Sequence, residues 1–309
     1  MRAVVLCAGL GTRLSPLTDR LPKPLVPVAN RAILDLILDR LGAVGIEDVG
    51  LNLHHMAPVI EAHVALRRNG RPRVHTVYEP EILDTGGGIA HFRAWGEQDG
   101  ALLVHNADIV TDLDITSVID SHQRTGAAAT LALVDDPRFN AVGIDEAGRV
   151  LDIRGTATVA ARLTLCGVYI LSRCFLQRLE PHRKASVVPA LREQIAREPG
   201  SVRAVRIPAS TYWRDLGHMS AYLDLHRDIL EGRGPCLPGV EIPPGGVMVA
   251  PDATLAPGAR LSGCVAIGPR CAIGRDVCLS DCVVLAGTRL QDGFAAHRAV
   301  ILDDLVIAA

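Results

Sequence analysis

The sequence predicts an α/β fold in which a Rossmann-like, mostly parallel sheet is followed by a small left-handed parallel β-helix. Three observations predict this architecture. Apolar strands alternate with helical patterns over about the first 230 residues, which is typical of parallel sheets. Four prolines and five glycines then occur between 232 and 246, the composition of a linker. Beyond the linker, aliphatic residues recur at every sixth position. We therefore expect an α/β domain over 1–232, a linker over 233–246 and a repeat domain over 247–309.

Composition and charge exclude several classes of protein. With a formal net charge of −2 over 309 residues, the chain has no signature of polyanion binding, so nucleic acid and anionic membranes are not expected partners. No apolar run approaches the roughly 18 residues of a membrane span, and the apolar start resembles a strand more than a signal peptide. Eight cysteines without any Cys-x-x-Cys pair predict reduced thiols. A cytoplasmic location is expected.

A buried strand at 3–6 leads directly into a loop that contains Gly9 and Gly11, followed by Arg13 and Lys23. The glycines permit a sharp turn whose N–H groups face an anion, and the two cations add positive charge. No third glycine follows at the spacing of a dinucleotide-binding turn, and the Gly-Lys-Ser/Thr of a Walker loop is absent. A polyphosphate is the simplest ligand for this loop.

The motif Gly-x-Gly-Thr-Arg at 9–13, followed nine residues later by Lys-Pro-Leu-x-Pro at 23–27, resembles the signature of the sugar-1-phosphate nucleotidylyltransferases, also called nucleotide-sugar pyrophosphorylases. The resemblance continues in order along about the first 230 residues. It implies a reaction that joins an NTP and a sugar 1-phosphate into an NDP-sugar and releases pyrophosphate. It also implies nucleotide binding by Ala8, Gly9, Gly11 and Thr12, and catalytic roles for Arg13 and Lys23.

Further elements follow from hydrophobic periodicity. Strands are expected at 46–53, 74–78, 101–105, 127–134 and 163–171, and helices at 33–41, 58–66, 185–197 and 219–229. Gly42 is the expected stop of the first helix. Such alternation places functional residues at the carboxyl ends of the strands. His54 and His55 lie just beyond a strand end, but no further metal-type residue occurs at ligand spacing, so we interpret them as polar loop residues.

The segment Glu81 to Ile89 carries Thr85 and three glycines that run into a helical pattern. The glycines permit close approach of a flat or anionic group, and a plain flexible turn is the simpler alternative. In the family this position holds the loop that reads the base, so the resemblance implies that Thr85 and Gly86 bind the nucleotide. The form Thr-Gly-Gly-Gly is similar to the N-acetylmuramate-1-phosphate uridylyltransferases, and mannose- and heptose-phosphate guanylyltransferases carry related versions. We expect a uridylyl- or guanylyltransferase.

Asp108 directly follows the end of a predicted strand, where a carboxylate is suited to holding Mg²⁺, although a lone aspartate there is more often a helix cap. The later element Trp-Arg-Asp-Leu-Gly at 213–217 resembles the W-x-D-x-G element of the family, whose aspartate completes the metal site. The resemblance therefore implies that Asp108 and Asp215 hold one Mg²⁺. Asp112 and Asp114 are nearby alternatives, and Asp114 precedes a helical pattern as an N-cap would.

The strand at 163–171 contains Gly167, where the family often has a small residue and a glycine that line the sugar pocket. Many relatives carry a Glu-Lys-Pro lysine before this strand that binds the sugar phosphate, and this chain lacks it. Arg154 or Arg162 could substitute, because a guanidinium holds phosphate in a bidentate fork. We predict sugar-phosphate binding by Gly167 and Arg154.

Aliphatic residues lie at strict six-residue spacing from Val249 to Leu285. This period predicts a triangular coil, with an ordinary β-rich cap as the alternative. Three hexads per coil would stack residues eighteen apart at about 4.8 Å, so Cys264 and Cys282 are expected to lie over one another as reduced thiols. We expect this domain to join subunits of a homo-oligomer. An acyltransferase is a further alternative, but it needs an active-site histidine and the repeat region offers only His297.

The predicted mechanism is in-line attack by a sugar 1-phosphate oxygen on the α-phosphorus of an NTP. Because the nucleophile is already an anion at neutral pH, no general base is required, and catalysis reduces to positioning and charge neutralisation. Arg13 is expected to bind the β- and γ-phosphates, and Lys23 the α-phosphate. The alternative is a catalytically silent regulatory homologue that binds a nucleotide-sugar. Both cations and both aspartates are kept, which argues against it, since a sensor needs neither the leaving-group cation nor a complete metal site.

Overall fold

The computed structural model describes residues 1–67, 70–237 and 239–308, which form two compact units. The first unit comprises Met1–Leu10 and Ile37–Trp213, and the second comprises Gly11–Leu36 and Arg214–Ala309. The chain therefore leaves the first unit in the middle of the glycine-rich loop. The chain leaves the first unit a second time within strand β13 (Trp213–Asp215).

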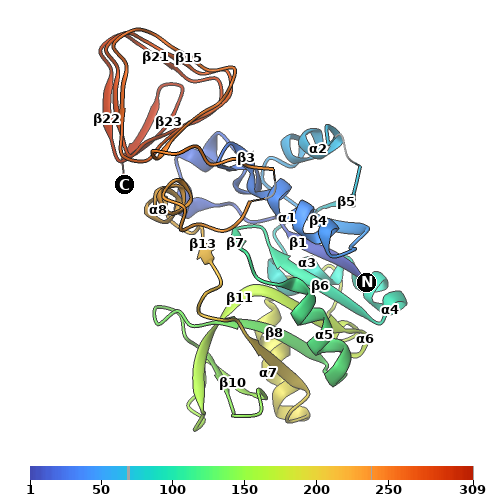
Figure 1. Ribbon diagram of the computed structural model, residues 1–309. Coiled ribbons are helices and arrows are strands. Elements are labelled where there is room, and N and C mark those ends of the chain that lie inside the picture. Colours follow the sequence, from blue (N-terminus) through green and yellow to red (C-terminus); the bar gives the residue numbers. More distant parts are fainter. Residues whose placement is uncertain (68–69, 238, 309) are drawn as a thin grey trace. The chain divides into compact units, whose positions relative to one another are not determined.

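The first unit is built on a nine-stranded mixed sheet with the order β10-β9-β11-β6-β1-β4-β5, in which β8 pairs with β11 and β12 (Figure 1). The central strand β1 is parallel to both β4 and β6, and β4 is parallel to β5. The parallel sheet that the sequence predicts is confirmed for these four strands. Beyond β6, strand β11 reverses direction and runs antiparallel to it.

The six strands predicted for this unit are present, with bounds that agree to within about two residues, the usual uncertainty of element ends. Strands β7, β9, β10 and β12 were not predicted. The strands span Arg2–Leu6 (β1), Asp48–Leu53 (β4), Arg73–Tyr78 (β5), Ala101–Asn106 (β6), Ile109–Thr111 (β7), Ala129–Val134 (β8), Val142–Ile144 (β9), Val150–Ile153 (β10), Ala161–Ser172 (β11) and Val202–Arg206 (β12).

Helices cover the faces of this sheet and bury their apolar side chains against it. They span Ala57–Ala65 (α2), Asp84–Ala90 (α3), Arg93–Asp99 (α4), Ile115–Thr125 (α5), Arg173–Leu176 (α6) and Val187–Arg197 (α7). The core joins fully buried strand residues such as Leu131 to helix residues such as Phe175 and Leu191. Asp114 caps α5 by accepting a hydrogen bond from the Thr116 N–H at 3.0 Å, which confirms its interpretation as an N-cap.

Helix α1 (Ile33–Ala43) continues through the expected stop at Gly42, so that prediction is wrong. Gly42 keeps a helical backbone, and its missing side chain makes room for Pro72, whose Cδ lies 3.3 Å from the position a Cβ would take. The chain turns instead at Gly45, where φ is +83°, and the Ile46 N–H donates to the Leu41 carbonyl at 3.1 Å. This left-handed glycine is the usual way to end a helix.

The second unit contains the remainder of the opening loop, helix α8 and a coil of short strands. Three turns of 3₁₀ helix cover Thr12–Leu14, Leu17–Asp19 and Lys23–Leu25, and a small hairpin follows at Pro27–Val28 (β2) and Arg31–Ala32 (β3). Helix α8 (Met219–Leu230) holds this segment, because the Tyr222 hydroxyl donates to the Pro27 carbonyl at 2.5 Å.

The coil consists of three sheets, which form the triangular outline in Figure 1. Their strands are parallel except for the last, β24, which runs antiparallel to β23. The sheets have the orders β14-β17-β20-β23-β24, β15-β18-β21 and β16-β19-β22. Their strands span Val247–Val249 (β14), Thr254–Leu255 (β15), Arg260–Ser262 (β16), Val265–Ile267 (β17), Ala272–Ile273 (β18), Cys278–Ser280 (β19), Val283–Val284 (β20), Arg289–Leu290 (β21), Ala295–His297 (β22), Ala299–Leu302 (β23) and Leu305–Ala308 (β24).

The eighteen-residue stacking predicted for the coil is confirmed in its first turn, where Val249 pairs with Ile267. It fails in the next turn, where Ile267 pairs with Val284, seventeen residues on. Val284 therefore takes the inward position expected for Leu285. The apolar run 283–285 hides this deletion in the sequence, because each of its residues is aliphatic.

The shortened turn also corrects the predicted stacking of Cys264 on Cys282. With a seventeen-residue offset, Cys264 lies level with Asp281, and its N–H donates to the Asp281 carboxylate at 3.1 Å. The expectation of reduced thiols is confirmed, since all eight cysteines are free. Within the described ranges, no helix is long and apolar enough to cross a membrane.

Candidate active site

The central strands of the first unit bring several predicted residues to one edge of the sheet. Leu6, the last residue of β1, is level with Asn52 on β4 and with Asn106 on β6. Because these strands are parallel, the segments that follow them leave at the same edge, where ligands of open α/β sheets bind. Those segments are 7–10 and Ala107–Asp108, so the start of the glycine-rich loop and the predicted metal ligand emerge side by side.

The loop in the first unit begins with two buried residues and then opens. Cys7 and Ala8 are buried, whereas a Cβ placed on Gly9 would meet no heavy atom within 4 Å. The φ angle of Gly9 is not positive, so neither strain nor crowding within the protein requires glycine here. Open space beside a strand-end glycine is what close approach by a ligand needs.

Burial and the nearby charge of Asp108 raise the pKa of the Cys7 thiol far above its usual range, with burial the larger cause. The thiol is therefore protonated at neutral pH and is neither a nucleophile nor a soft metal ligand. The same effect places the Asp108 carboxylate close to the start of the loop.

In the second unit, the loop residues Gly11, Thr18 and Lys23 pack together. Gly11 has a φ of +68°, and a Cβ on it would lie 2.9 Å from Thr18 Cγ2 and 3.2 Å from Lys23 Cβ. The Thr18 hydroxyl donates to the Gly11 carbonyl at 2.9 Å. The fold of the loop therefore requires glycine at position 11. The same packing fixes the position of the Lys23 Cβ, from which the side chain extends.

Arg13 and Asp215 also lie together in this unit, at Gly217. A Cβ on Gly217 would lie 2.5 Å from Arg13 Nη1 and 3.2 Å from Asp215 Oδ1. The motif arginine and the late aspartate, about two hundred positions apart, therefore share one small space. Any side chain at 217 would displace the guanidinium.

The two alternatives to Asp108 each serve the fold. Asp112 accepts a hydrogen bond from the Tyr212 N–H at 2.7 Å, and Asp114 caps a helix. Asp108 itself is half-buried in the turn after β6. Among the described residues, no group of three or more His, Cys, Asp or Glu side chains is placed to hold a metal.

The Thr-Gly-Gly-Gly segment lies inside helix α3, where the rest of the unit crowds it. A Cβ on Gly86 would meet the Ala185 carbonyl oxygen at 2.7 Å, and one on Gly87 would meet that of Arg183 at 2.5 Å. The Gly86 N–H donates to Ala185 at 2.8 Å, and the Thr85 hydroxyl accepts from the Val187 N–H at 2.9 Å. The close approach that these glycines permit is made here by the protein's own backbone.

Gly167 lies at an irregularity of β11, between its pairs at Leu165 and Tyr169, with a φ of +87°. A Cβ there would lie 3.1 Å from Asn106 Nδ2, so the glycine leaves room for this side chain. The Asn106 Oδ1 is buried and has no hydrogen-bond partner among the described residues.

The two candidate arginines differ in what surrounds them. Arg162 donates to both carboxylate oxygens of Asp152, at 2.7 and 3.0 Å, and this pairing lowers the pKa of Asp152. Arg154 is exposed, with a left-handed backbone (φ 57°) and its N–H bonded to Ala141. Ile153, the residue before Arg154, is level with Leu163, and four residues of β11, roughly 13 Å of extended strand, separate that level from Gly167.

His54 behaves as the polar loop residue expected. Its Nδ1 lies 2.8 Å from the Glu79 carbonyl oxygen, and its ring stacks on Tyr78. His105 in β6 is fully buried, and this burial lowers its pKa to about 4, so it is neutral near pH 7.

Sequence reasoning missed Asn52 and Glu79, which are buried at the same edge of the sheet. The Asn52 amide accepts from the Cys7 N–H and donates to Glu79, each at 2.9 Å. One signal was present: Asn52 interrupts an apolar strand close to its end, and Glu79 directly follows the next strand.

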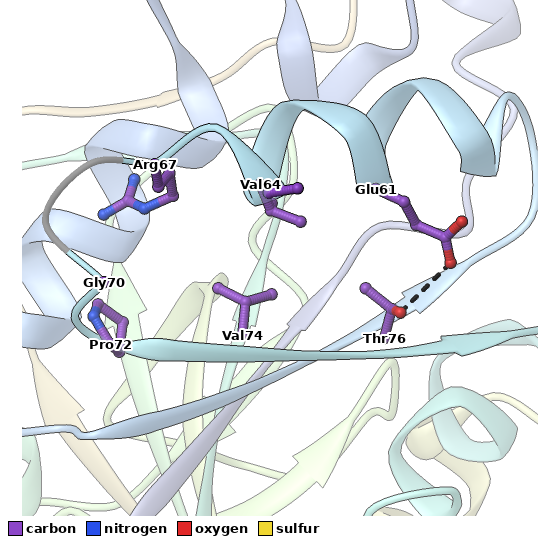
Figure 2. Close-up of a pocket in the computed structure, with 8 residues that line it drawn as sticks. Glu61, Val64, Arg67, Gly70, Pro72, Val74 and Thr76 are labelled. Atoms are coloured by element: carbon purple, nitrogen blue, oxygen red, sulfur yellow. Dashed lines mark hydrogen bonds between the residues drawn. The ribbon is translucent and has the colours of Figure 1, made fainter.

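A surface cavity elsewhere contains none of the predicted residues. This cavity has a volume of about 330 Å³ and lies between α2 and β5. Glu61 and Thr76 in its lining share a hydrogen bond of 3.3 Å, drawn as a dashed line in Figure 2. Its lining, which includes Val64, Arg67, Pro72 and Val74, gathers no catalytic chemistry.

Comparison with known proteins identifies the family. Residues 2–232 match the family described as nucleotidyl transferase. A mannose-1-phosphate guanylyltransferase from Mycobacterium tuberculosis is 32% identical over 300 residues, which cover 96% of this chain and 83% of the relative. An N-acetylmuramate alpha-1-phosphate uridylyltransferase from Caulobacter vibrioides is 45% identical over 112 residues, which cover 35% of this chain and 46% of the relative.

Among solved structures, HddC from Yersinia pseudotuberculosis complexed with GMP-PN is similar with a TM-score of 0.60 and 25% identity. The likeness covers 72% of this chain and 96% of HddC. The resemblance identified from the loop motif is therefore confirmed over most of the chain. This chain belongs to the nucleotidyl transferase family, among its sugar-1-phosphate nucleotidylyltransferases.

Proposed function

We propose that this chain transfers a nucleoside monophosphate from an NTP to a sugar 1-phosphate, yielding an NDP-sugar and pyrophosphate. The observation that carries the proposal is the packing of Arg13 against Gly217 beside Asp215 in the second unit. This arrangement puts a leaving-group cation next to a carboxylate suited to Mg²⁺, which nucleotidyl transfer needs and passive binding does not.

GTP with mannose 1-phosphate is the first substrate pair to test. It is favoured because the guanylyltransferase from M. tuberculosis aligns with 96% of this chain, the C-terminal coil included. UTP with N-acetylmuramate 1-phosphate is the second pair. It is favoured by the Thr-Gly-Gly-Gly form of residues 85–88 and by the higher local identity of 45% to the uridylyltransferase.

In the proposed mechanism, the sugar phosphate oxygen attacks the α-phosphorus in line with the departing pyrophosphate. The backbone N–H groups of Ala8 to Thr12 face the nucleotide, with Gly9 giving access. Thr85 and Gly86 contact it from the start of α3. Arg13 neutralises the β- and γ-phosphates and stabilises the leaving group, while Lys23 holds the α-phosphate where negative charge builds up.

Asp108 and Asp215 would hold Mg²⁺, which supplies charge neutralisation to the phosphates of both substrates when bound. The donor set fits this ion, because Mg²⁺ takes one or two carboxylates and completes its shell with phosphates and water. The buried Cys7 thiol near Asp108 stays protonated and does not compete for it.

For the sugar phosphate, we propose Arg154 together with Gly167. Arg162 is engaged with Asp152 on both of its carboxylate oxygens, whereas Arg154 projects from an exposed position. Arg154 would then replace the lysine that many relatives carry.

We further propose that residues 1–232 form a catalytic domain and residues 247–309 a repeat domain, joined by a linker at 233–246. The coil of the repeat domain is proposed to be left-handed and to join subunits of a homo-oligomer. We also propose that the protein acts in the cytoplasm. The parallel stacking of the short strands in the coil supports the assignment of a β-helix. Sedimentation of the full chain beside a variant shortened before 247 tests the oligomer.

A panel of pyrophosphate-release assays tests the reaction. It crosses GTP, UTP, CTP and dTTP with mannose, N-acetylmuramate and heptose 1-phosphates in the presence of Mg²⁺. We expect release with GTP or UTP, dependent on both the sugar phosphate and Mg²⁺. Binding of an NDP-sugar without release from any pair would instead indicate a catalytically silent sensor and overturn the proposal.

A further inference from the structure

Two buried polar side chains at the edge of the sheet have no role in the chemistry described so far. Asn52 near the end of β4 is 3% exposed, and Glu79 directly after β5 is 0% exposed. Within the described residues, Glu79 has no Lys or Arg within ion-pair distance. His91 Nε2 lies 3.7 Å away, but burial lowers the pKa of this histidine, so it is neutral near pH 7. A fully buried carboxylate is rarely kept without a function for its oxygens.

Both carboxylate oxygens of Glu79 accept hydrogen bonds that lead in opposite directions. The Leu83 N–H donates to Oε2 at 2.9 Å, and the Asn52 Nδ2 donates to Oε1 at 2.9 Å. The Asn52 Oδ1 accepts in turn from the Cys7 N–H at 2.9 Å. A continuous relay thus connects the first residue of the glycine-rich loop with the residue before helix α3.

The surroundings leave this relay no freedom to shift. The Glu79 N–H donates to the Leu53 carbonyl at 2.7 Å, which fixes its backbone to β4. A Cβ on Gly88 would lie 2.5 Å from Asn52 Nδ2 and 3.2 Å from Glu79 Oε1, so α3 rests directly on the two side chains. This contact explains why position 88 holds a glycine, because any side chain there would collide with Asn52.

We propose that Asn52 and Glu79 are positioning residues that set the spacing between Ala8–Gly9 and Thr85–Gly86. This inference rests on the proposed function, which assigns those two segments to the nucleotide. Neither side chain touches a substrate. They act through the backbone of Cys7 and Leu83, and a small error in that spacing misplaces the NTP while leaving the sugar-phosphate contacts in place.

The direction of the hydrogen bonds gives the proposal a sharp test. Both ends of the relay are backbone donors, so the pair must offer an acceptor at each end and a single donor between them. An amide followed by a carboxylate meets this demand, and so does a carboxylate followed by an amide. Asn52→Asp alone would put two carboxylates in contact, and Glu79→Gln alone would turn an amide N–H₂ toward another donor. The double exchange would restore all three hydrogen bonds and the net charge.

The experiment compares the full-length wild type with Asn52→Asp, Glu79→Gln and the double variant. Thr130→Val is the matched control, because Thr130 is equally buried and bonds to His122 in the same unit, but on β8. KM for the NTP and KM for the sugar 1-phosphate are measured separately by pyrophosphate release, with the midpoint of thermal unfolding recorded for each protein.

We expect each single variant to raise KM for the NTP by about ten- to hundredfold and KM for the sugar 1-phosphate by less than about twofold, as the loss of a buried hydrogen bond at one subsite predicts. The double variant should return to within about threefold of the wild type. Thr130→Val should lower the unfolding temperature and raise neither KM.

Equal changes in both KM values, or a folded double variant that is no better than the single ones, would overturn the relay. A wild type that turns over no substrate pair would refute the proposed function instead. In that case, calorimetric titration of the same proteins with GTP and UTP tests the relay independently of turnover. The relay predicts that each single exchange raises the Kd for the nucleotide and that the double exchange restores the wild-type Kd.

Discussion

Two glycine-rich segments look alike in the sequence, but their glycines have different surroundings in the structure. The first, around Gly9, faces open space, with no heavy atom within 4 Å of the position a Cβ would take. The second, in helix α3, is crowded by the protein itself, since a Cβ on Gly87 would lie 2.5 Å from the Arg183 carbonyl oxygen. Glycine permits close approach in both places, but the approaching group differs. At Gly9 it can be a ligand, and at Gly87 it is the backbone of the same unit.

This difference separates residues whose loss affects chemistry from residues whose loss affects folding. A residue that faces open space contributes little to stability, so its substitution should be visible mainly in kinetics. A residue in tight internal contact should be visible mainly in the free energy of unfolding. The following variants test that separation, from the largest expected effect to the smallest.

Arg13→Ala should lower kcat/KM by about a hundredfold or more, because one preorganised cation beside the leaving group is lost. The unfolding temperature should hardly change, since Arg13 is exposed. Steady-state kinetics and thermal unfolding check both parts. Arg20→Ala, an exposed arginine in the same loop that pairs with Asp304 at 3.3 Å, is the control and should keep wild-type kinetics. Normal turnover by Arg13→Ala would refute its catalytic role.

Gly87→Ala should lower the free energy of unfolding by about 2 kcal/mol, because forcing a methyl group into a filled space outweighs the gain in helix propensity of about 1 kcal/mol. Denaturant titration followed by circular dichroism measures the change. A variant as stable as the wild type would show that α3 moves away from residues 183–185 without an energetic cost. Gly87 would then not be required by internal contacts, contrary to our interpretation.

Gly9→Ala is the matched opposite of Gly87→Ala. The same methyl group should leave the free energy of unfolding within about 0.5 kcal/mol of the wild type, as for surface substitutions away from tight contacts. It should raise KM for the NTP by about tenfold, because the methyl group occupies space proposed for the nucleotide. Titration with denaturant and pyrophosphate-release kinetics give the two values. A destabilised Gly9→Ala protein with unchanged KM would reverse the assignment of the two segments.

The two arginines near the proposed sugar-phosphate site extend the same test. Arg154→Ala should raise KM for the sugar 1-phosphate alone, because the residue is exposed, whereas Arg162→Ala should act on stability through Asp152. Arg162 lowers the pKa of Asp152 in the folded protein. The pair therefore stabilises the protein above the unfolded-state pKa of about 3.9, and this contribution is lost as pH falls through the lower folded-state pKa.

Thermal unfolding of wild type and Arg162→Ala as a function of pH measures that contribution. The gap between the two proteins should be present at neutral pH and should close under acid conditions. A gap that is unchanged at low pH would mean that Arg162 stabilises the protein by packing and not by charge.

The sequence was sufficient where a residue's role depends on its immediate neighbours. The four central parallel strands, the N-cap at Asp114 and the eighteen-residue period of the first coil turn all follow from local patterns. It was insufficient where a role depends on contacts from distant segments. The crowding of Gly87 by Arg183 and the relay through Asn52 and Glu79 are made between elements that the chain brings together only on folding. The seventeen-residue coil turn was hidden for another reason, because adjacent aliphatic residues can exchange inward positions without changing the pattern.

The central claim is that this chain transfers a nucleotidyl group by attack at the α-phosphorus of an NTP. GTP and UTP, each labelled with ³²P at either the α- or the γ-position, can be supplied to the wild type with Mg²⁺ and the matching sugar 1-phosphate. The account predicts that the α-label appears in the NDP-sugar and the γ-label in pyrophosphate, in equal amounts. A γ-label transferred to the sugar product, or an NDP-sugar bound without release of labelled pyrophosphate, would contradict it.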